Sequence, residues 1–158
     1  MLRSKLFVAG SGVVLSVTAV ALLSVSFLAS GRDDLPAQQA SIAHGKYLVQ
    51  IAGCNDCHTA GYTQLEGKVP VAQWLTGDRL GWRGPWGTTY PENLRLKLAS
   101  FSEDQWLAHA RVMRPRPPMP WFNFNAMSDV DLRSIHRFVI ALGPAGTHVP
   151  DYVPPDAE

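Results

Sequence analysis

Two cysteines constrain this chain more than any other feature, because they are its only two and both lie in Cys54-Asn55-Asp56-Cys57-His58. Two thiols three positions apart can form thioether bonds to the two vinyl groups of one porphyrin, while the adjacent imidazole reaches the iron. The motif therefore predicts one covalently attached haem c, held by Cys54 and Cys57, with His58 as an axial ligand of the iron.

Other uses of the cysteine pair fit the sequence less well. A thioredoxin-like dithiol would need a βαβ pattern around it, and none is seen. A structural zinc site would need four ligands, whereas only His44 and His58 lie near the pair. A disulfide that closes so short a loop would contribute little stability. A haem-free dithiol protein is kept as a minor alternative.

The second axial ligand decides what the iron can do, and the sequence favours Met119. This methionine lies in the segment RPRPPMPW at 114–121, whose four prolines predict a stiff, extended loop with few backbone donors. Such a loop can hold a weakly binding thioether in place. Met119 is therefore predicted as the other axial iron ligand.

The remaining methionines and histidines are interpreted otherwise. Met113 and Met127 belong to predicted helices and are expected in the core. His44 precedes Cys54 so closely that it should fall on the wrong side of the porphyrin. Polar surface or edge positions are predicted for His109, His136 and His148.

The N-terminal segment is predicted to direct the chain out of the cytoplasm. Arg3 and Lys5 precede an uncharged run whose apolar part is Leu6–Leu28, and positive charge before such a run marks the cytoplasmic end. The run exceeds the usual core of a signal peptide and reaches the roughly 20 residues that span a bilayer. Ala29-Ser30-Gly31 is nevertheless a possible cleavage site. We expect a periplasmic protein, either anchored in the inner membrane by residues 6–28 or soluble after cleavage.

Four regions follow from composition: a signal or anchor segment at 1–30, a polar linker at 31–40, a cofactor-binding domain at 41–143 and a Pro-rich extended tail at 144–158. The chain carries 14 basic and 13 acidic side chains, a formal net charge of +1. This balance gives no reason to expect a nucleic-acid partner.

Three amphipathic helices are predicted. The first covers 41–52 after the capping residue Ser41, and Gly45 in its middle is expected to let another backbone approach closely. Its apolar face is predicted to contain Ala43, Tyr47, Leu48 and Ile51.

The second and third helices carry clearer end signals. The second covers 102–113, with Ser102 and Gln105 as a capping box and Trp106, Ala110 and Met113 on one side. The third follows Ser128 and ends at Gly143. Its apolar positions are Leu132, Ile135, Val139 and Leu142. No convincing strand alternation lies between the helices, and the segment 62–90 is predicted to form loops.

Several residues keep more than one interpretation. Four tryptophans could line the haem or bind its propionates, or simply pack in the core: Trp74, Trp82, Trp86 and Trp121. Three arginines could pair with propionates, dock an acidic partner or lie in solvent: Arg111, Arg114 and Arg116. Either Pro70 or Pro85 is expected to supply the carbonyl that orients the His58 ring.

These motifs resemble a class I cytochrome c over about residues 45–143. The order of parts agrees, with CNDCH first, then Met119 and then a closing amphipathic helix. Gly45 and Phe138 are similar to the family's helix-crossing pair. The resemblance implies a small all-α fold with three main helices and long loops around haem c, preceded by the N-terminal hydrophobic helix.

Two stretches narrow the resemblance. GPWGTTYPEN at 84–93, and MPW at 119–121 followed by MSDVDL, are similar to the cytochrome c subunits of bacterial alcohol and sugar-acid dehydrogenases. Those subunits carry three such modules, whereas this chain has one CxxCH motif. A mono-haem carrier or a small dehydrogenase-linked subunit is therefore expected.

An iron held by His58 and Met119 has no open position for a substrate, which predicts one-electron transfer rather than catalysis. The expected partners are redox proteins: a dehydrogenase, an oxidase or another cytochrome. The alternative is a haem sensor or a peroxidase-like enzyme, in which the sixth ligand is displaceable.

Overall fold

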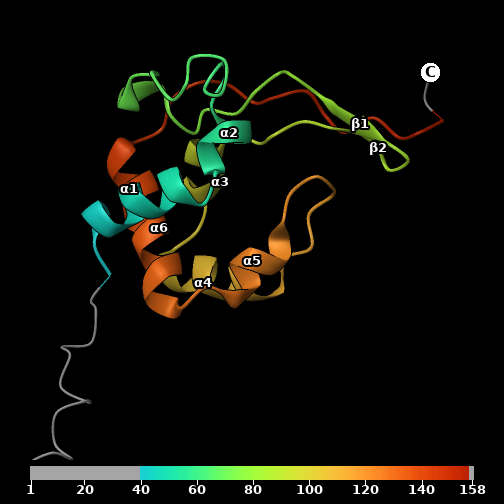
Figure 1. Cartoon of the computed structure of the whole chain (residues 1–158). Coiled ribbons are helices and arrows are strands. Elements are labelled where there is room, and N and C mark those ends of the chain that lie inside the picture. The colour runs from blue at the N-terminus through green and yellow to red at the C-terminus, as the bar shows by residue number, and fades with distance from the viewer. Residues whose placement is uncertain (1–39, 157–158) are drawn as a thin grey trace, which may run out of the picture. The chain divides into compact units, whose positions relative to one another are not determined.

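Helices α1 (Ile42–Ile51) and α6 (Asp129–Leu142) cross at Gly45, and this is the most extensive helix contact in the part of the chain that the structure describes. The structure is a computed structural model, and it describes residues 40–156. Helix α4 (Glu103–Val112) packs against α6 from another side (Figure 1). These three helices are the three predicted from periodicity, and each lies within a residue or two of its predicted bounds.

Shorter elements connect the three helices. They are α2 (Cys54–His58), the 3-10 turn η1 (Val71–Gln73), strands β1 (Trp82–Gly84) and β2 (Gly87–Thr89), α3 (Leu94–Ala99) and α5 (Trp121–Ala126). The periodicity did not predict α3, although Asn93 caps it through bonds from the backbone N–H groups of Arg95 and Leu96. It also missed α5, which is too short to show a repeat.

The predicted N-caps are confirmed. Ser41 accepts a hydrogen bond from the backbone N–H of His44. The capping box of Ser102 and Gln105 is complete, and Ser128 forms a second box with Asp131. These local signals fix where the main helices begin.

Gly45 lies against the backbone of α6, as predicted. A Cβ atom at this position would lie 1.9 Å from the carbonyl oxygen of Ser134 and 2.8 Å from the Cβ of Phe138. No residue with a side chain fits there without moving a helix. Phe138 is buried at this crossing, so the two residues of the expected pair do meet.

The predicted apolar face of α1 is wrong. Gly45 and Val49 face α6 and are buried, and Leu48 packs beside the core. Tyr47 and Ile51 instead expose 55% and 61% of their surface, and Ala43 is also exposed. The physical reason is that the close approach at Gly45 turns the glycine side of the helix inward.

The predicted apolar faces of α4 and α6 are largely confirmed. Trp106 and Ala110 are buried on α4, and Met113 packs beside the core. On α6 the buried residues include three of those predicted, Leu132, Ile135 and Val139, while Leu142 lies at the border of the core.

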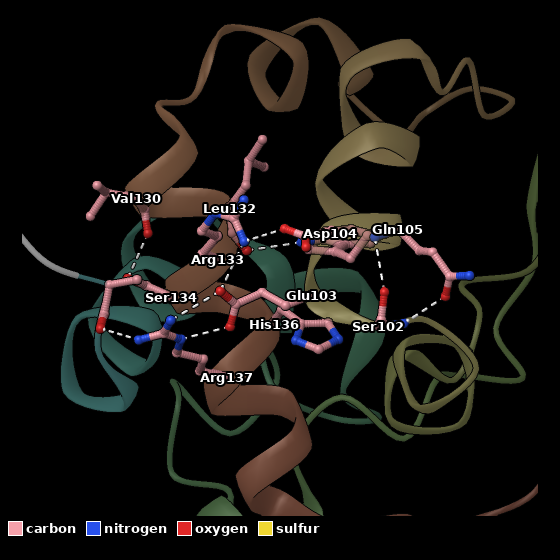
Figure 2. A network of polar contacts seen from close by, with 12 residues as sticks. Ser102, Glu103, Asp104, Gln105, Val130, Leu132, Arg133, Ser134, His136 and Arg137 are labelled. Carbon is pink, nitrogen blue, oxygen red and sulfur yellow. Dashed lines mark hydrogen bonds and ion pairs between the residues drawn. The ribbon is translucent and has the colours of Figure 1, made fainter.

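A polar network joins the first turn of α4 to α6 (Figure 2). The Glu103 carboxylate accepts hydrogen bonds from Arg137 at 2.7 Å and from Arg133 at 3.0 Å. These bonds hold the pKa of Glu103 at about 2, well below its usual value. Beneath them, the Trp106 indole donates to the backbone carbonyl of Leu132.

His136 is buried rather than on the surface, which corrects its prediction. Only 7% of its surface is exposed, and its Nε2 lies 3.1 Å from the carbonyl oxygen of Phe101. His109 is stacked on the Phe101 ring, with centroids 5.0 Å apart. His148 is exposed, as expected.

A small hairpin corrects the expectation that no strand lies between the helices. Strands β1 and β2 pair antiparallel across the two-residue turn Pro85-Trp86. The C-terminal tail runs beside this hairpin (Figure 1), and the backbone groups of Val153 bond to those of Thr88. The tail is extended, as predicted, but it is hydrogen-bonded to the domain.

The predicted span at 6–28, and most of the 31–40 linker, lie outside the described residues. No helix among residues 40–156 has the length and hydropathy that crossing a bilayer requires.

Candidate functional site

Helix α2 presents both cysteines on one helical turn. Gly53, with φ of +71°, allows the chain to turn from α1 directly into α2. Cys54 is buried and Cys57 half-buried, and both are free thiols. Burial raises the pKa of Cys54 to about 12, and burial together with Asp56 raises the pKa of Cys57. The two sulfurs are therefore neutral thiols, and neither is used in a disulfide.

Buried hydrogen bonds fix the conformation of this turn. The Thr59 hydroxyl donates to the Asn55 side-chain oxygen at 2.7 Å and accepts from the backbone N–H of Leu75 at 2.8 Å. Asn55 and Thr59 are almost completely inaccessible to solvent. The segment that carries Cys57 and His58 is thus connected to the loop at Leu75 by bonds that exclude water.

His58 is oriented by the backbone of Glu92. Its Nδ1 lies 2.7 Å from the Glu92 carbonyl oxygen. Because a carbonyl can only accept, Nδ1 carries the proton and Nε2 keeps its lone pair. Burial lowers the pKa of His58, which favours this neutral form. Within residues 40–156 no partner occupies Nε2, so it can bind a metal.

The orienting carbonyl was expected from Pro70 or Pro85, and both expectations are wrong. Pro70 precedes η1, and Pro85 lies in the hairpin turn. Any residue type can offer a backbone carbonyl, so composition gives no signal for Glu92. Its position just before the N-cap Asn93 is the one local hint.

Met119 lies in the loop between α4 and α5, half-buried at the border of the hydrophobic core. That core also contains Cys54, so both predicted ligand segments border one apolar cluster. No described contact joins Met119 to α2 directly. Met113 and Met127 also pack against the core, as predicted.

Contacts connect the Met119 loop to the hairpin through the C-terminal tail. The Arg116 guanidinium lies 3.7 Å from the centre of the Tyr152 ring, and the Tyr152 hydroxyl donates to the Trp86 carbonyl at 2.7 Å. Tyr152 therefore joins two segments that are separate in sequence, and both of them carry candidate site residues.

The hairpin contains two polar groups without partners. Trp86 Nε1 and Thr89 Oγ1 are buried, and neither has a hydrogen-bond partner among the described residues. An unpaired buried donor costs about 1–3 kcal/mol, so such groups usually have a partner. Each of these orphan groups could donate to the carboxylate of a bound group, such as a haem propionate.

Most of the other candidate tryptophans and arginines have partners in the protein. The buried Trp74 donates its indole N–H to Val69, which supports its packing role. Arg111 pairs with Asp129, and Arg114 stacks on Trp121 at 3.9 Å. Trp82 is exposed on β1.

A haem iron needs few ligands from the protein. No group of three His, Cys, Asp or Glu side chains within residues 40–156 could hold a metal ion. Haem iron takes four ligands from the porphyrin, so one imidazole and one thioether are enough. Two free thiols on one turn, an oriented imidazole and orphan donors are therefore compatible with a c-type haem.

Comparison with known proteins gives one distant relative. The cytochrome c subunit of the quinone alcohol dehydrogenase of Gluconobacter oxydans (strain 621H) is 30% identical over 130 residues. The match covers 76% of this chain and 25% of the relative, so the chain spans about a quarter of the length of that protein. No family model and no solved structure matches the chain. The relationship agrees with the cytochrome c resemblance seen in the sequence.

Proposed function

We propose that this chain is a one-electron transfer protein with one covalently bound haem c. Cys54 and Cys57 would form the thioether bonds, and His58 and Met119 would be the axial ligands. The observation that carries the proposal is the His58 ring, whose Nδ1 proton is donated to a backbone carbonyl while Nε2 stays free, one residue from a free thiol.

Each group in the chain has a separate task in this proposal. The bound haem would supply an iron that alternates between the ferric and ferrous states. The Glu92 carbonyl fixes the His58 ring and increases its basicity. The apolar cluster that borders Met119 excludes water from the thioether side. With both axial positions filled by protein atoms, the iron would have no site for a substrate, so the chain is not itself an enzyme.

The partner is proposed from the relative. That protein is named as the cytochrome c subunit of an alcohol dehydrogenase, and a dehydrogenase is the electron donor proposed here. The chain would work on the periplasmic side, because its N-terminal charge pattern predicts export. Residues 6–28 would either anchor the chain in the inner membrane or be removed after export.

The proposed architecture is that of a class I cytochrome c. Three observations support it: the crossing of α1 and α6 at Gly45 and Phe138, the early α2 with both cysteines, and the late loop with Met119. The β1–β2 hairpin and the short α3 and α5 are additions to the three main helices.

The test compares two methionine variants of the protein expressed with c-type haem maturation. A denaturing gel stained for haem should show covalent haem in the wild type and none after Cys54→Ala and Cys57→Ala together. The ferric spectrum should show the weak far-red sulfur-to-iron band, which Met119→Ala removes. Met113→Ala is the matched control, because Met113 also borders the core, and it should keep the band.

Two results would contradict the proposal. The absence of covalent haem in the wild type would leave only a dithiol protein. A wild type that holds haem, lacks the far-red band and binds carbon monoxide readily in the ferrous state would favour the sensor or peroxidase-like alternative.

A further inference from the structure

The C-terminal strap, defined here as residues 143–154, is held by side chains that follow Glu92. The Asn93 amide nitrogen donates to the carbonyls of Ala145 at 2.8 Å and Thr147 at 3.2 Å. Its amide oxygen caps α3 at the same time. Asn93 is 4% exposed, and both ends of its side-chain amide are used in hydrogen bonds. One buried side chain therefore connects the strap to the residue next to Glu92.

Arg95 adds a second connection on the same segment. Its buried guanidinium donates to three backbone carbonyls, those of Ala72, Leu142 and Gly143. Two of these belong to the end of α6 and the start of the strap. The segment 93–95 is thus bonded on one side to the C-terminal part of the chain and on the other to η1.

The surroundings of Gly77 show how closely the strap packs against the segment that follows Glu92. A Cβ atom there would lie 2.6 Å from a methyl group of Val149 in the strap and 2.9 Å from the backbone nitrogen of Asn93. The Gly77 N–H donates to the carbonyl of His58 at 2.8 Å. The His58 backbone, Gly77, the 91–93 segment and the strap therefore form one continuous packed stack.

We propose that Asn93 is a positioning residue through which the C-terminal strap holds the Glu92 carbonyl against His58, and so sets the reduction potential of the haem. The inference rests on the proposed function, because it concerns the ligand that His58 would provide. It goes further by assigning a role to a buried amide and to a C-terminal segment that do not contact the predicted ligands.

The direction of the effect follows from ligand basicity. A strong hydrogen bond from Nδ1 makes the imidazole a better electron donor and favours ferric iron. If the strap no longer fixes the 91–93 segment, the Glu92 carbonyl becomes mobile and this bond weakens. Ferric iron then loses stabilisation, and the reduction potential rises. Because Asn93 acts through one intermediate residue, the equilibrium constant for reduction should increase roughly three- to tenfold, about 30–59 mV for one electron.

Three variants of the haem-loaded chain separate positioning from general stability. Asn93→Ser keeps a capping oxygen for α3 but loses the donors to the strap. Gly146→Ala disturbs the contact between the strap and Asn93 without changing Asn93 itself, since Gly146 has φ of +73° and its new Cβ would lie 3.0 Å from the Asn93 amide nitrogen. Ser100→Ala is the matched control, because the exposed Ser100 bonds only to the Lys97 carbonyl at the other end of α3, and its loss changes neither the charge nor the contacts of the strap.

Two readouts are needed: spectroelectrochemical potential, and solvent exchange of the His58 Nδ1 proton in the ferrous protein by NMR. We expect Asn93→Ser and Gly146→Ala to raise the potential and speed this exchange, whereas Ser100→Ala should change neither. If Asn93→Ser does not fold, Gly146→Ala decides alone.

If the wild type carries haem but Gly146→Ala changes neither the potential nor the exchange rate, this inference is wrong and the proposed function still stands. A wild type without covalent haem overturns both, and the haem-stained gel tells these two failures apart.

Discussion

Replacing Gly45 by alanine tests the packing on which the domain depends. The new methyl carbon would lie 1.9 Å from the Ser134 carbonyl oxygen and 2.5 Å from its carbonyl carbon. Ordinary contact begins near 3.4 Å, so the shortfall is about 1.5 Å (3.4 − 1.9). Both atoms belong to the backbone of α6, so no side-chain rotation can relieve the clash and the helices must separate.

The expected cost combines two opposing effects. Overpacking of a well-packed contact costs about 1–3 kcal/mol, and the upper end applies because backbone must move. Alanine is the better helix former by about 1 kcal/mol, which offsets part of this cost. The net loss in the free energy of unfolding should be about 2 kcal/mol. For a domain of this size, this lowers Tm by roughly 8 °C.

The assay is thermal and urea unfolding of the haem-loaded protein, followed by circular dichroism. Ala43→Gly is the matched control, because Ala43 is exposed on the same helix and reports the glycine-to-alanine difference without the clash. It should cost about 1 kcal/mol. A Gly45→Ala variant as stable as the wild type, or more stable, would refute the close-packing argument.

Three further predictions concern other regions. Glu103, whose pKa is held at about 2 by Arg137 and Arg133, stabilises the domain above pH 4.5, and this contribution disappears as the pH falls through 2. Glu103→Gln should therefore cost about 1 kcal/mol at pH 7 after solvent screening, and the difference from wild type should vanish in acid unfolding curves. Ser128→Ala should lower the free energy of urea unfolding by about 1 kcal/mol through loss of the cap of α6; no loss would mean that the capping box is not used. Trp86→Phe should destabilise the haem-loaded protein by about 1 kcal/mol if its orphan N–H binds a propionate, whereas equal or higher stability in urea would show that this donor has no partner.

The helices could be predicted because their signals are local. Caps at Ser102 and Ser128 and the apolar repeat of α6 lie within a few turns of sequence. The buried face of α1 could not be read in the same way, because Gly45 contributes nothing to hydropathy and yet marks the contact. Tyr47 and Ile51 dominate the apolar pattern of that helix but lie in solvent.

The candidate site could likewise be predicted only where its signals are local in the sequence. Cys54, Cys57 and His58 follow from one five-residue motif, and the structure places them on one short helix. The Glu92 carbonyl belongs to a residue 34 positions away from His58. Every residue type has a backbone carbonyl, so the sequence does not indicate which one the imidazole uses. The role of Asn93 was equally invisible, because its partners are backbone carbonyls of the strap. Met119 as an iron ligand stays a prediction.

The crossing of α1 and α6 also has a consequence for the order in which the molecule is assembled. His44 and Asp131, 87 positions apart, form a 2.7 Å pair at this crossing. A chain that leaves the cytoplasm N-terminus first would expose α2 long before α6 follows, so the cysteines would be accessible while the core is still open. If the proposed haem is attached at that stage, attachment would precede closure of the core, and a variant that cannot pack α6 would still carry covalently bound haem although it is unfolded.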